Sequence, residues 1–296
     1  MPELPDIAVY IERLQARVVG SRLREVRLLN PFVLRTAVPP LSAVEGQAVV
    51  SVERLGKRIV FGFGADGPLL VIHLMIAGRL KWLADGDKLP APARAVLAAL
   101  RFDSGRIAFT EAGTTRSASL HVLADRAALR AMDPGGIDVL SADEAAFAAQ
   151  LARENHTLKR SLTDPRLFSG IGNAYSDEIL HRARLSPVAL SRSLKPDEVR
   201  RLHEATRTVL VEWTDRLRAE AGDWPRKVTA FHPQMAVHGR YGQPCPVCAT
   251  PVQRIVYADN ETNYCPRCQT GGRLLADRAL STLLKKSWPR HIDDIE

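Results

Sequence analysis

The sequence predicts an α+β fold with two domains, the first rich in β-strands and the second helical. Between residues 23 and 123, short β-rich segments alternate with Gly, Pro, Asp and Asn, which is typical of a β-sandwich or barrel. From about residue 141 the apolar positions take helical spacing. All four cysteines lie between residues 245 and 268 and indicate a further small module. A length of 296 residues suits about two domains with cores of their own.

The predicted elements follow one another in a simple order. A helix at residues 7–19 opens the chain. The segments predicted as strands are 23–29, 48–52, 58–63, 69–74, 79–83, 96–102, 106–110 and 120–123. A linker follows from Pro134 to about 140. Helices are predicted at 141–153, 155–162, 174–183 and 195–221, and Ser141 with Glu144 predicts a capping box for the first of these. A final amphipathic stretch, 274–284, ends at Lys285-Lys286.

The charge balance favours a polyanionic partner. The chain has 41 Lys and Arg against 33 Asp and Glu, a net charge of +8, which suits nucleic acid or a membrane surface. The excess is +2 over residues 1–150, +4 over 151–229 and +2 over 230–296, so no single tail carries it. No apolar run is long enough to cross a membrane, and the N-terminus lacks a signal-peptide pattern. We therefore expect a cytoplasmic protein, associated with the nucleoid if its source is bacterial, and no membrane partner.

The cysteines form two short hooks, Cys245-Pro-Val-Cys248 and Cys265-Pro-Arg-Cys268. Two such hooks at this separation predict one tetrahedral Zn²⁺ site. The segment between the hooks reads as a hairpin with a turn at Asp259-Asn260. Four thiolates close the coordination shell, so the metal would be structural. The alternative is a pair of disulfides in a secreted protein, which the absence of a signal-peptide pattern disfavours.

The N-terminal residues Pro2 and Glu3 predict covalent amine catalysis. Removal of Met1 would expose the secondary amine of Pro2, and an α-amino group has a pKa near 8. Attack of that amine on a sugar C1′ gives an iminium ion, which favours β-elimination of the neighbouring phosphate. Glu3 lies beside it as a general acid or base. The alternative is that Pro-Glu-Leu-Pro only begins a helix.

The segment Gly170-Ile-Gly-Asn173 precedes a predicted helix whose exposed N–H groups suit a phosphate. Asn173 adds a side-chain donor there, and the preceding helix brings the positive charge of Lys159. Such a helix–turn–helix unit binds a nucleic-acid backbone without reading sequence. The alternative is a plain turn between two helices.

These motifs, in this order, resemble the formamidopyrimidine-DNA glycosylase / endonuclease VIII family over residues 2–269. The resemblance implies a β-sandwich domain at 2–133, a helix–two-turns–helix domain at 141–228, a zinc finger at 236–270 and a C-terminal extension at 271–296, with DNA bound in a cleft between the domains. It implies that Pro2 is the Schiff-base nucleophile, that Glu3 is the acid/base, and that Lys57 acts on the phosphate beside the lesion. Asn173 and Lys159 would contact the DNA backbone. The zinc ligands would be Cys245, Cys248, Cys265 and Cys268.

Three departures from the family pattern affect these expectations. Asp6 replaces the usual second glutamate, one methylene shorter. Ile76 stands where the usual intercalating methionine would align, and only Arg116 could supply a wedge or guanidinium from the loop 110–117. The arginine with which the finger usually clamps phosphate aligns with Asn260, so Arg254 or Arg267 would substitute. Because unstacking a base costs a few kcal/mol, we expect a preference for weakened or single-stranded sites and little reading of the opposite base.

The sequence therefore predicts a monomeric DNA repair enzyme that binds damaged DNA, with glycosylase and apurinic/apyrimidinic lyase activities. Oxidised or ring-opened bases and bare abasic sites all suit it, as do β- and β,δ-elimination. One alternative is a non-catalytic protein that binds damaged DNA or DNA structures on the same scaffold. Another is a zinc-ribbon adaptor, which would bind nucleic acid through residues 235–296 alone.

Overall fold

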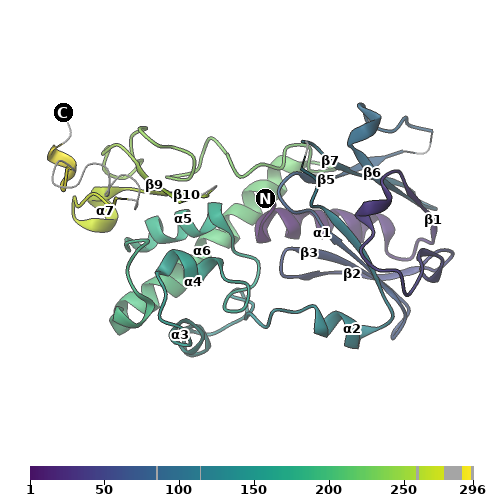
Figure 1. Cartoon of the computed structure of the whole chain (residues 1–296), viewed down its shortest axis with the longest axis horizontal. Helices are drawn as coiled ribbons and strands as arrows, with labels where there is room; N and C mark the ends of the chain where they lie inside the picture. Colours follow the sequence, from purple (N-terminus) through teal and green to yellow (C-terminus); the bar gives the residue numbers. More distant parts are fainter. Residues whose placement is uncertain (85, 114, 258–259, 277–288, 295–296) are drawn as a thin grey trace. The chain divides into compact units, whose positions relative to one another are not determined.

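A computed structural model describes residues 1–84, 86–113, 115–257, 260–276 and 289–294 (Figure 1). The chain divides into two compact units. The first unit comprises Met1–Pro134 and Trp213–Thr229, and the second comprises Gly135–Glu212 and Ala230–Glu296. The sequence-based boundaries differ from this division, because the last part of the long helix α6 (Pro196–Ala221) and the stretch after it pack with the first unit. The predicted β-sandwich followed by a helical domain with a four-cysteine module is confirmed.

The first unit contains two four-stranded antiparallel sheets, with strand orders β1-β6-β7-β5 and β2-β3-β4-β8. Helix α1 (Leu4–Val18) precedes the sheets. The strands are β1 (Leu23–Leu28), β2 (Val49–Leu55), β3 (Arg58–Phe63), β4 (Leu69–His73), β5 (Gly78–Leu83), β6 (Val96–Phe102), β7 (Gly105–Glu111) and β8 (Ser119–Leu123). Each lies within a few residues of a predicted strand.

The core of the first unit lies between the two sheets and includes one face of α1. Phe61 of β3 and Phe102 of β6 stack across it with ring centroids 6.2 Å apart. Trp224 joins the same core from the stretch after α6, and its indole N–H donates to the carbonyl of Leu80 at 2.9 Å. Burial of this stretch explains why residues 213–229 belong with the sandwich.

The outer face of the second sheet is covered by a helix that the sequence did not predict, α2 (Arg126–Ala131). Asp125 caps it by accepting from the Ala128 N–H at 2.8 Å. Leu129 packs on Val60 and Val71, whose side chains point away from the main core. Strand β3 is therefore buried on both faces, which accounts for its continuous apolar run.

Among its described residues, the second unit is helical apart from one hairpin. Its helices are α3 (Glu144–Ala152), α4 (Leu158–Thr163), α5 (Asn173–Ala183), the first part of α6, and α7 (Pro266–Thr270), and the hairpin is β9 (Gln253–Tyr257) with β10 (Asn260–Tyr264). The predicted capping box of Ser141 and Glu144 is wrong. Asp143 is the N-cap of α3 and accepts from the Ala146 N–H at 2.8 Å, so the helix begins at Glu144, three residues after its predicted start.

Short 3-10 helices occupy Pro31–Val33, Leu41–Ala43, Ala93–Ala95, Ser191–Ser193 and Ile292–Asp294. Within the part of the chain that the structure describes, no helix is both long and apolar enough to cross a membrane. Most of the predicted amphipathic stretch 274–284, its Lys285-Lys286 end and Asp259 of the predicted finger turn lie outside the described residues.

Candidate active site and metal centre

The first candidate site is the start of α1, where Pro2 and Glu3 are buried although they stand almost at the end of the chain. Glu3 is the N-cap of α1 and forms a capping box with Asp6. In that box the Asp6 carboxylate accepts from the Glu3 N–H at 2.9 Å. Pro5 stands in the first turn, where its missing N–H removes no helical hydrogen bond. The segment Pro-Glu-Leu-Pro therefore does begin a helix, as the alternative to a catalytic role predicted. This local structure does not decide whether Pro2 also has a chemical role.

The amino group at the chain start lies in surroundings that favour its neutral form. Burial lowers the pKa of the Met1 amine below its usual value, and the charges of Arg79 and Lys57 lower it further. The carboxylates of Glu3 and Asp6 act in the opposite direction. The structure thus brings Glu3 and Lys57, two predicted catalytic residues, within electrostatic range of one amine.

Asp6 is almost fully buried, and burial raises the pKa of its carboxyl to about 7. The negative charge of Glu3 raises this pKa as well, whereas the Glu3 N–H and the charge of Arg79 lower it. An aspartate at this position therefore changes protonation state near neutral pH. Asp6, which replaces the usual second glutamate of the family, is therefore a titratable group near the amine.

Lys57 lies in the turn between β2 and β3, next to Gly56, whose φ of +61° suits a residue without a side chain. The register of β3 with β4 sets Arg58 opposite His73. Burial and the charges of Arg58 and Lys57 lower the pKa of His73 to about 4, so its imidazole is neutral at physiological pH. His73 is not among the predicted site residues. Its position at the end of a predicted strand, directly before the loop 74–78, is the one feature of the sequence that could have indicated a place near the site.

The loop between β4 and β5 carries the residue aligned with the intercalating methionine. Met75 has a φ of 52°, and the next side chain, Ile76, is 64% exposed. Arg79 of β5 fixes this loop, because its Nη1 donates to the carbonyls of Gly78 at 2.7 Å and Ile76 at 3.2 Å. Ile76 therefore presents one apolar side chain from a held backbone. The sequence does not indicate this role of Arg79, because the residue stands there only as one polar position of a predicted strand.

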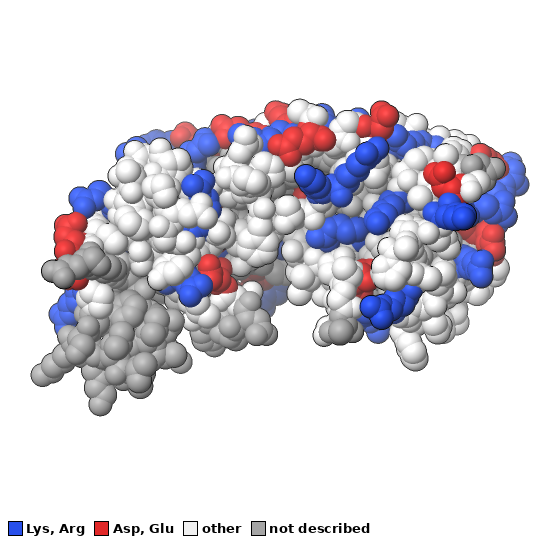
Figure 2. Space-filling model, turned by 90° about the horizontal axis from the view of Figure 1, so that it is seen from above, with Lys and Arg blue, Asp and Glu red and all other residues white. Residues whose placement is uncertain are grey.

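Arg116, the other predicted wedge or DNA contact, lies in an exposed loop of the first unit. Its guanidinium donates to the carbonyl of Arg94. Buried Glu111 holds the end of this loop by accepting from the Ser117 N–H at 3.1 Å and the Ala118 N–H at 3.2 Å. Figure 2 shows Lys and Arg side chains on the surface of both units, with a group of them over the first unit.

A cavity of about 590 Å³ lies beside Asp6 within the first unit. Its lining consists of Asp6 and Val9 of α1 and of residues between Leu217 and Val228, including Trp224. Arg79 donates from Nε to the carbonyl of Val228 at 2.9 Å and so ties the end of this lining to β5. The volume is in the range of small-molecule pockets. The sequence could not predict this cavity, because it depends on how residues 222–228 return to α1.

The second candidate site is the turn before α5, where Asn173 is the first residue of the helix. The Asn173 side-chain amide donates to the carbonyl of Glu261 in β10 at 3.0 Å. Lys159 of α4 donates from Nζ to the carbonyl of Asn173 at 2.7 Å and to the Asp177 carboxylate at 2.5 Å. The Lys159 side chain is only 14% exposed. Its ammonium is therefore committed to the helix start rather than presented to solvent.

Asp177 and Glu178 of α5 connect this turn to the rest of the second unit. Asp177 is fully buried and accepts from His238 Nδ1 at 2.8 Å and from the Asn263 N–H at 3.2 Å. Glu178 accepts from the N–H groups of Ala236, Val237 and His238 at 2.7 to 3.0 Å. Burial raises the pKa of the Glu178 carboxyl. Two neighbouring carboxyls thus hold the 235–239 segment and the β9–β10 hairpin against the helix that begins at Asn173.

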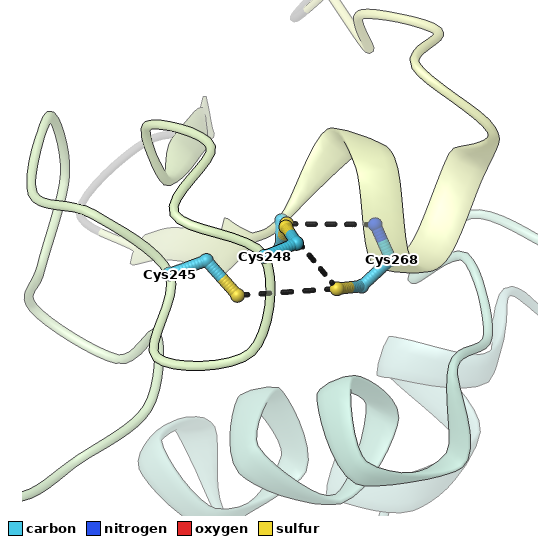
Figure 3. A group of neighbouring side chains, drawn as sticks. Cys245, Cys248 and Cys268 are labelled. Atoms are coloured by element: carbon cyan, nitrogen blue, oxygen red, sulfur yellow. Dashed lines mark hydrogen bonds between the residues drawn. The ribbon is translucent and has the colours of Figure 1, made fainter.

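The four cysteines form the metal centre. Their Sγ atoms all lie within 4.8 Å of one another, and Figure 3 shows Cys245, Cys248 and Cys268 turned toward a common point. The Sγ–Sγ distances are 3.9 Å for Cys245–Cys268, 3.4 Å for Cys248–Cys265 and 3.5 Å for Cys248–Cys268. A zinc ion with four sulfur ligands at about 2.3 Å requires Sγ–Sγ distances of about 3.8 Å. The residues therefore fit one tetrahedral Zn²⁺, as predicted.

Neighbouring side chains orient the metal ligands. The His181 Nε2 lies 3.3 Å from the Cys245 Sγ, which connects α5 to the first hook. Gln269 accepts from the Cys265 N–H at 2.8 Å and donates to the carbonyl of Leu185 at 2.9 Å. A shell of this kind fixes the ligands and fastens the module to the helices.

The arginines predicted to replace the clamping residue of the finger are both engaged. Arg254 lies 3.1 Å from the Glu261 carboxylate, with its guanidinium carbon 4.3 Å above the centroid of the Tyr241 ring. Arg267 pairs with Asp293 at 2.8 Å. Asn260 is exposed at the start of β10. Of the two, Arg254 lies on the same hairpin as Asn260.

Comparison with known proteins covers nearly the whole chain. Residues 1–116 match the formamidopyrimidine-DNA glycosylase N-terminal domain, residues 136–216 its H2TH domain, and residues 242–271 the zinc finger found in FPG and IleRS. A formamidopyrimidine-DNA glycosylase of Symbiobacterium thermophilum is 32% identical over 280 residues, which cover 91% of this chain and 89% of that protein. One of Thermus thermophilus is 34% identical over 287 residues, which cover 92% of this chain and 100% of that protein.

Solved structures agree with these sequence matches. The crystal structure of MutM (FPG) from Thermus thermophilus has a TM-score of 0.76 at 33% identity and covers 90% of this chain and 98% of that chain. Lactococcus lactis Fpg in complex with abasic-site DNA has a TM-score of 0.80 at 22% identity, covering 90% of this chain and 99% of that chain. The second likeness supports the fold alone.

Proposed function

This chain belongs to the formamidopyrimidine-DNA glycosylase family, and from that premise we propose that it is a bifunctional DNA glycosylase with abasic-site lyase activity. Its substrates are oxidised or ring-opened bases in DNA and bare abasic sites. The observation that carries the proposal is that Pro2 and Glu3 are buried at the start of α1, in surroundings that favour the neutral form of the Met1 amine. Once Met1 is removed, the Pro2 amine takes its place in these surroundings. A neutral amine is the form that attacks carbon.

Catalysis begins after removal of Met1 has exposed the secondary amine of Pro2. The Pro2 nitrogen attacks C1′ of the damaged nucleotide, and the bond from C1′ to the base breaks as the base leaves with a proton. Glu3 supplies and accepts protons at the sugar while the ring opens. The amine loses its own proton, and the product is an iminium ion between Pro2 and C1′. A bare abasic site forms the same iminium with loss of water.

The iminium then directs strand cleavage. It withdraws electrons from C2′, so a base can remove a C2′ proton while the 3′ phosphate leaves in β-elimination. Loss of the 5′ phosphate by δ-elimination can follow, and hydrolysis of the iminium frees the amine. Lys57, in the turn beside the amine, holds a phosphate next to the reacting sugar.

The remaining predicted DNA-binding residues differ in how directly they would contact the DNA. Asn173 donates one side-chain N–H to Glu261, and its second N–H can reach a phosphate. Lys159 acts at the DNA through Asn173, whose carbonyl it fixes. Arg116 and Arg254 are exposed enough to add phosphate contacts at the surface. Zinc, when bound to the four cysteines, supplies folding energy to the finger and takes no part in the reaction.

Ile76 is the only side chain that this proposal assigns to filling the gap left by an extruded base. One exposed isoleucine replaces little of the lost stacking, so the enzyme favours sites where the base is already unstacked. The protein acts on damaged DNA as a monomer, in the cytoplasm or at the nucleoid.

Borohydride trapping on an oligonucleotide with a single abasic site tests the proposal. Wild type should form a covalent adduct, and Pro2→Gly or an uncleavable N-terminal extension should abolish or strongly reduce it. Pro5→Ala is the matched control, because it changes the same helix start and leaves the terminal amine intact. Absence of an adduct with wild type, together with intact binding, would instead support the non-catalytic DNA-binding alternative.

A further inference from the structure

The Arg79 side chain joins the loop after β4 to the end of the stretch that follows α6, and its charge acts on the amine at the chain start. It leaves β5 and makes three hydrogen bonds to backbone carbonyls: one to Ile76 in the loop before β5, one to Gly78 at the start of β5 and one to Val228. We propose that Arg79 is a positioning residue for the N-terminal nucleophile, whose guanidinium fixes both neighbouring segments and presents a permanent positive charge to the amine. This inference rests on the Schiff-base chemistry proposed above.

The bonding pattern uses the geometry of a guanidinium. Nε donates to Val228 at 2.9 Å, while Nη1 donates to Gly78 at 2.7 Å and to Ile76 at 3.2 Å. A planar fork can serve three acceptors at once, whereas a lysine ammonium on its flexible stem acts as a single point charge. One side chain therefore sets the distance between the Ile76 loop and the end of the cavity lining.

The same side chain acts on the amine through its charge. Four ionisable groups surround the amine: Glu3 and Asp6 from α1, Lys57 from the β2–β3 turn, and Arg79 from β5. The two carboxylates stabilise the charged amine, and the two cations destabilise it. Arg79 is the larger of these two cationic effects on the amine. It also acts on the Asp6 carboxyl, whose pKa it lowers.

The hydrogen bonds of Arg79 and its positive charge both favour attack by the amine. The carbonyls that Arg79 binds belong to the segments that carry Ile76 and that end the 590 Å³ cavity beside Asp6. An amine that is held neutral beside fixed segments is ready to attack a sugar presented to it. Arg79 has no part in bond making, and its influence passes through the amine and the loops.

Two substitutions separate the two effects. Arg79→Gln removes the charge and retains an amide N–H donor, whereas Arg79→Lys retains the charge and loses the three-way fork. Lys81→Gln is the matched control, because Lys81 is an exposed cation two residues along the same strand. Single-turnover borohydride trapping on abasic DNA over a pH series that brackets neutrality gives the rate of iminium formation. Release of a damaged base from duplex DNA gives the effect on substrate positioning.

Arg79→Gln should raise the pKa of the amine and so move the acid limb of the trapping profile to higher pH. On that limb the rate should fall by about threefold or more, because the neutral fraction of the amine falls about threefold for each half unit by which its pKa rises. Arg79→Lys should keep the limb in place and lower base release from duplex DNA. A profile of Arg79→Gln that overlays wild type, or an equal displacement by Lys81→Gln, would overturn the inference. If wild type itself gives no adduct at any pH, the Schiff-base proposal fails instead. Tryptophan fluorescence of each variant checks that the first unit is folded.

Discussion

Asp6→Asn should stabilise the first unit at and above neutral pH and leave it unchanged under acid conditions. The reason is that burial raises the pKa of the Asp6 carboxyl from 3.8 to about 7. The unfolded chain releases this proton near pH 4, whereas the folded chain retains it until about pH 7. Between these values the unfolded state binds fewer protons, so wild-type stability falls as the pH rises. Asparagine carries no such proton and still offers an oxygen to the Glu3 N–H.

The magnitude follows from the pKa difference. About three units at about 1.4 kcal/mol each correspond to about 4 kcal/mol, fully expressed above pH 7 and absent below about pH 4. Solvent screening takes little from this value, because Asp6 is nearly inaccessible to water. A difference of this size is a large fraction of the stability of a domain.

Urea unfolding of wild type and Asp6→Asn at several pH values is the measurement. Three of the four tryptophans, Trp82, Trp213 and Trp224, belong to the first unit, and replacing the fourth, Trp288, by phenylalanine in both proteins makes the fluorescence specific for that unit. The difference in unfolding free energy should grow through the acid range and level off above pH 7. A difference that is constant with pH, or that is largest under acid conditions, would refute the assignment of a buried, late-titrating carboxyl at residue 6.

Three further predictions concern binding and the second unit. Lys57→Ala should weaken binding to abasic and undamaged DNA alike and reduce the slope of log affinity against log salt by about 1, measured by fluorescence anisotropy. Glu178→Gln should lower the unfolding free energy of the second unit by about 1 to 3 kcal/mol, because an amide nitrogen cannot accept the backbone N–H groups that the carboxylate serves; hydrogen exchange at residues 236–238 would report it. Cys248→Ser, or chelation of zinc, should release the metal and reduce DNA binding while the tryptophan transition of the first unit stays in place, and a shift of that transition would contradict a local role.

Local patterns were sufficient for most of the fold. The strands of the sandwich could be predicted because each is a short apolar run closed by turn residues, and β3 from Arg58 to Phe63 matches its prediction. The hooks Cys245–Cys248 and Cys265–Cys268 predicted their cluster because their spacing alone determines how thiolates meet. Helix α2 was missed because its six residues bury little besides Leu129 and show no clear period.

The candidate site was predictable only where chemistry and sequence position coincide. Pro2 and Glu3 are adjacent to the amine by covalent structure, so residue type was enough to identify them. The capping role of Asp6 could have been read from its spacing to Glu3, three residues apart at the start of a helix. The buried ion pair of Lys159 with Asp177 could not be predicted, because a lysine in a short helix does not indicate which carboxylate lies next to it in the fold.

The cations around the amine come together through sheet pairing rather than through any motif. Antiparallel pairing of β3 with β4 sets Arg58 opposite His73, so the turn that carries Lys57 must lie beside the loop that follows His73. That loop runs directly into β5, whose second residue is Arg79. A shift of the β3–β4 register by one residue would turn every side chain of a strand to its other face. Hence the same register that buries the apolar side of the sandwich also determines which positive charges lie near the N-terminal amine.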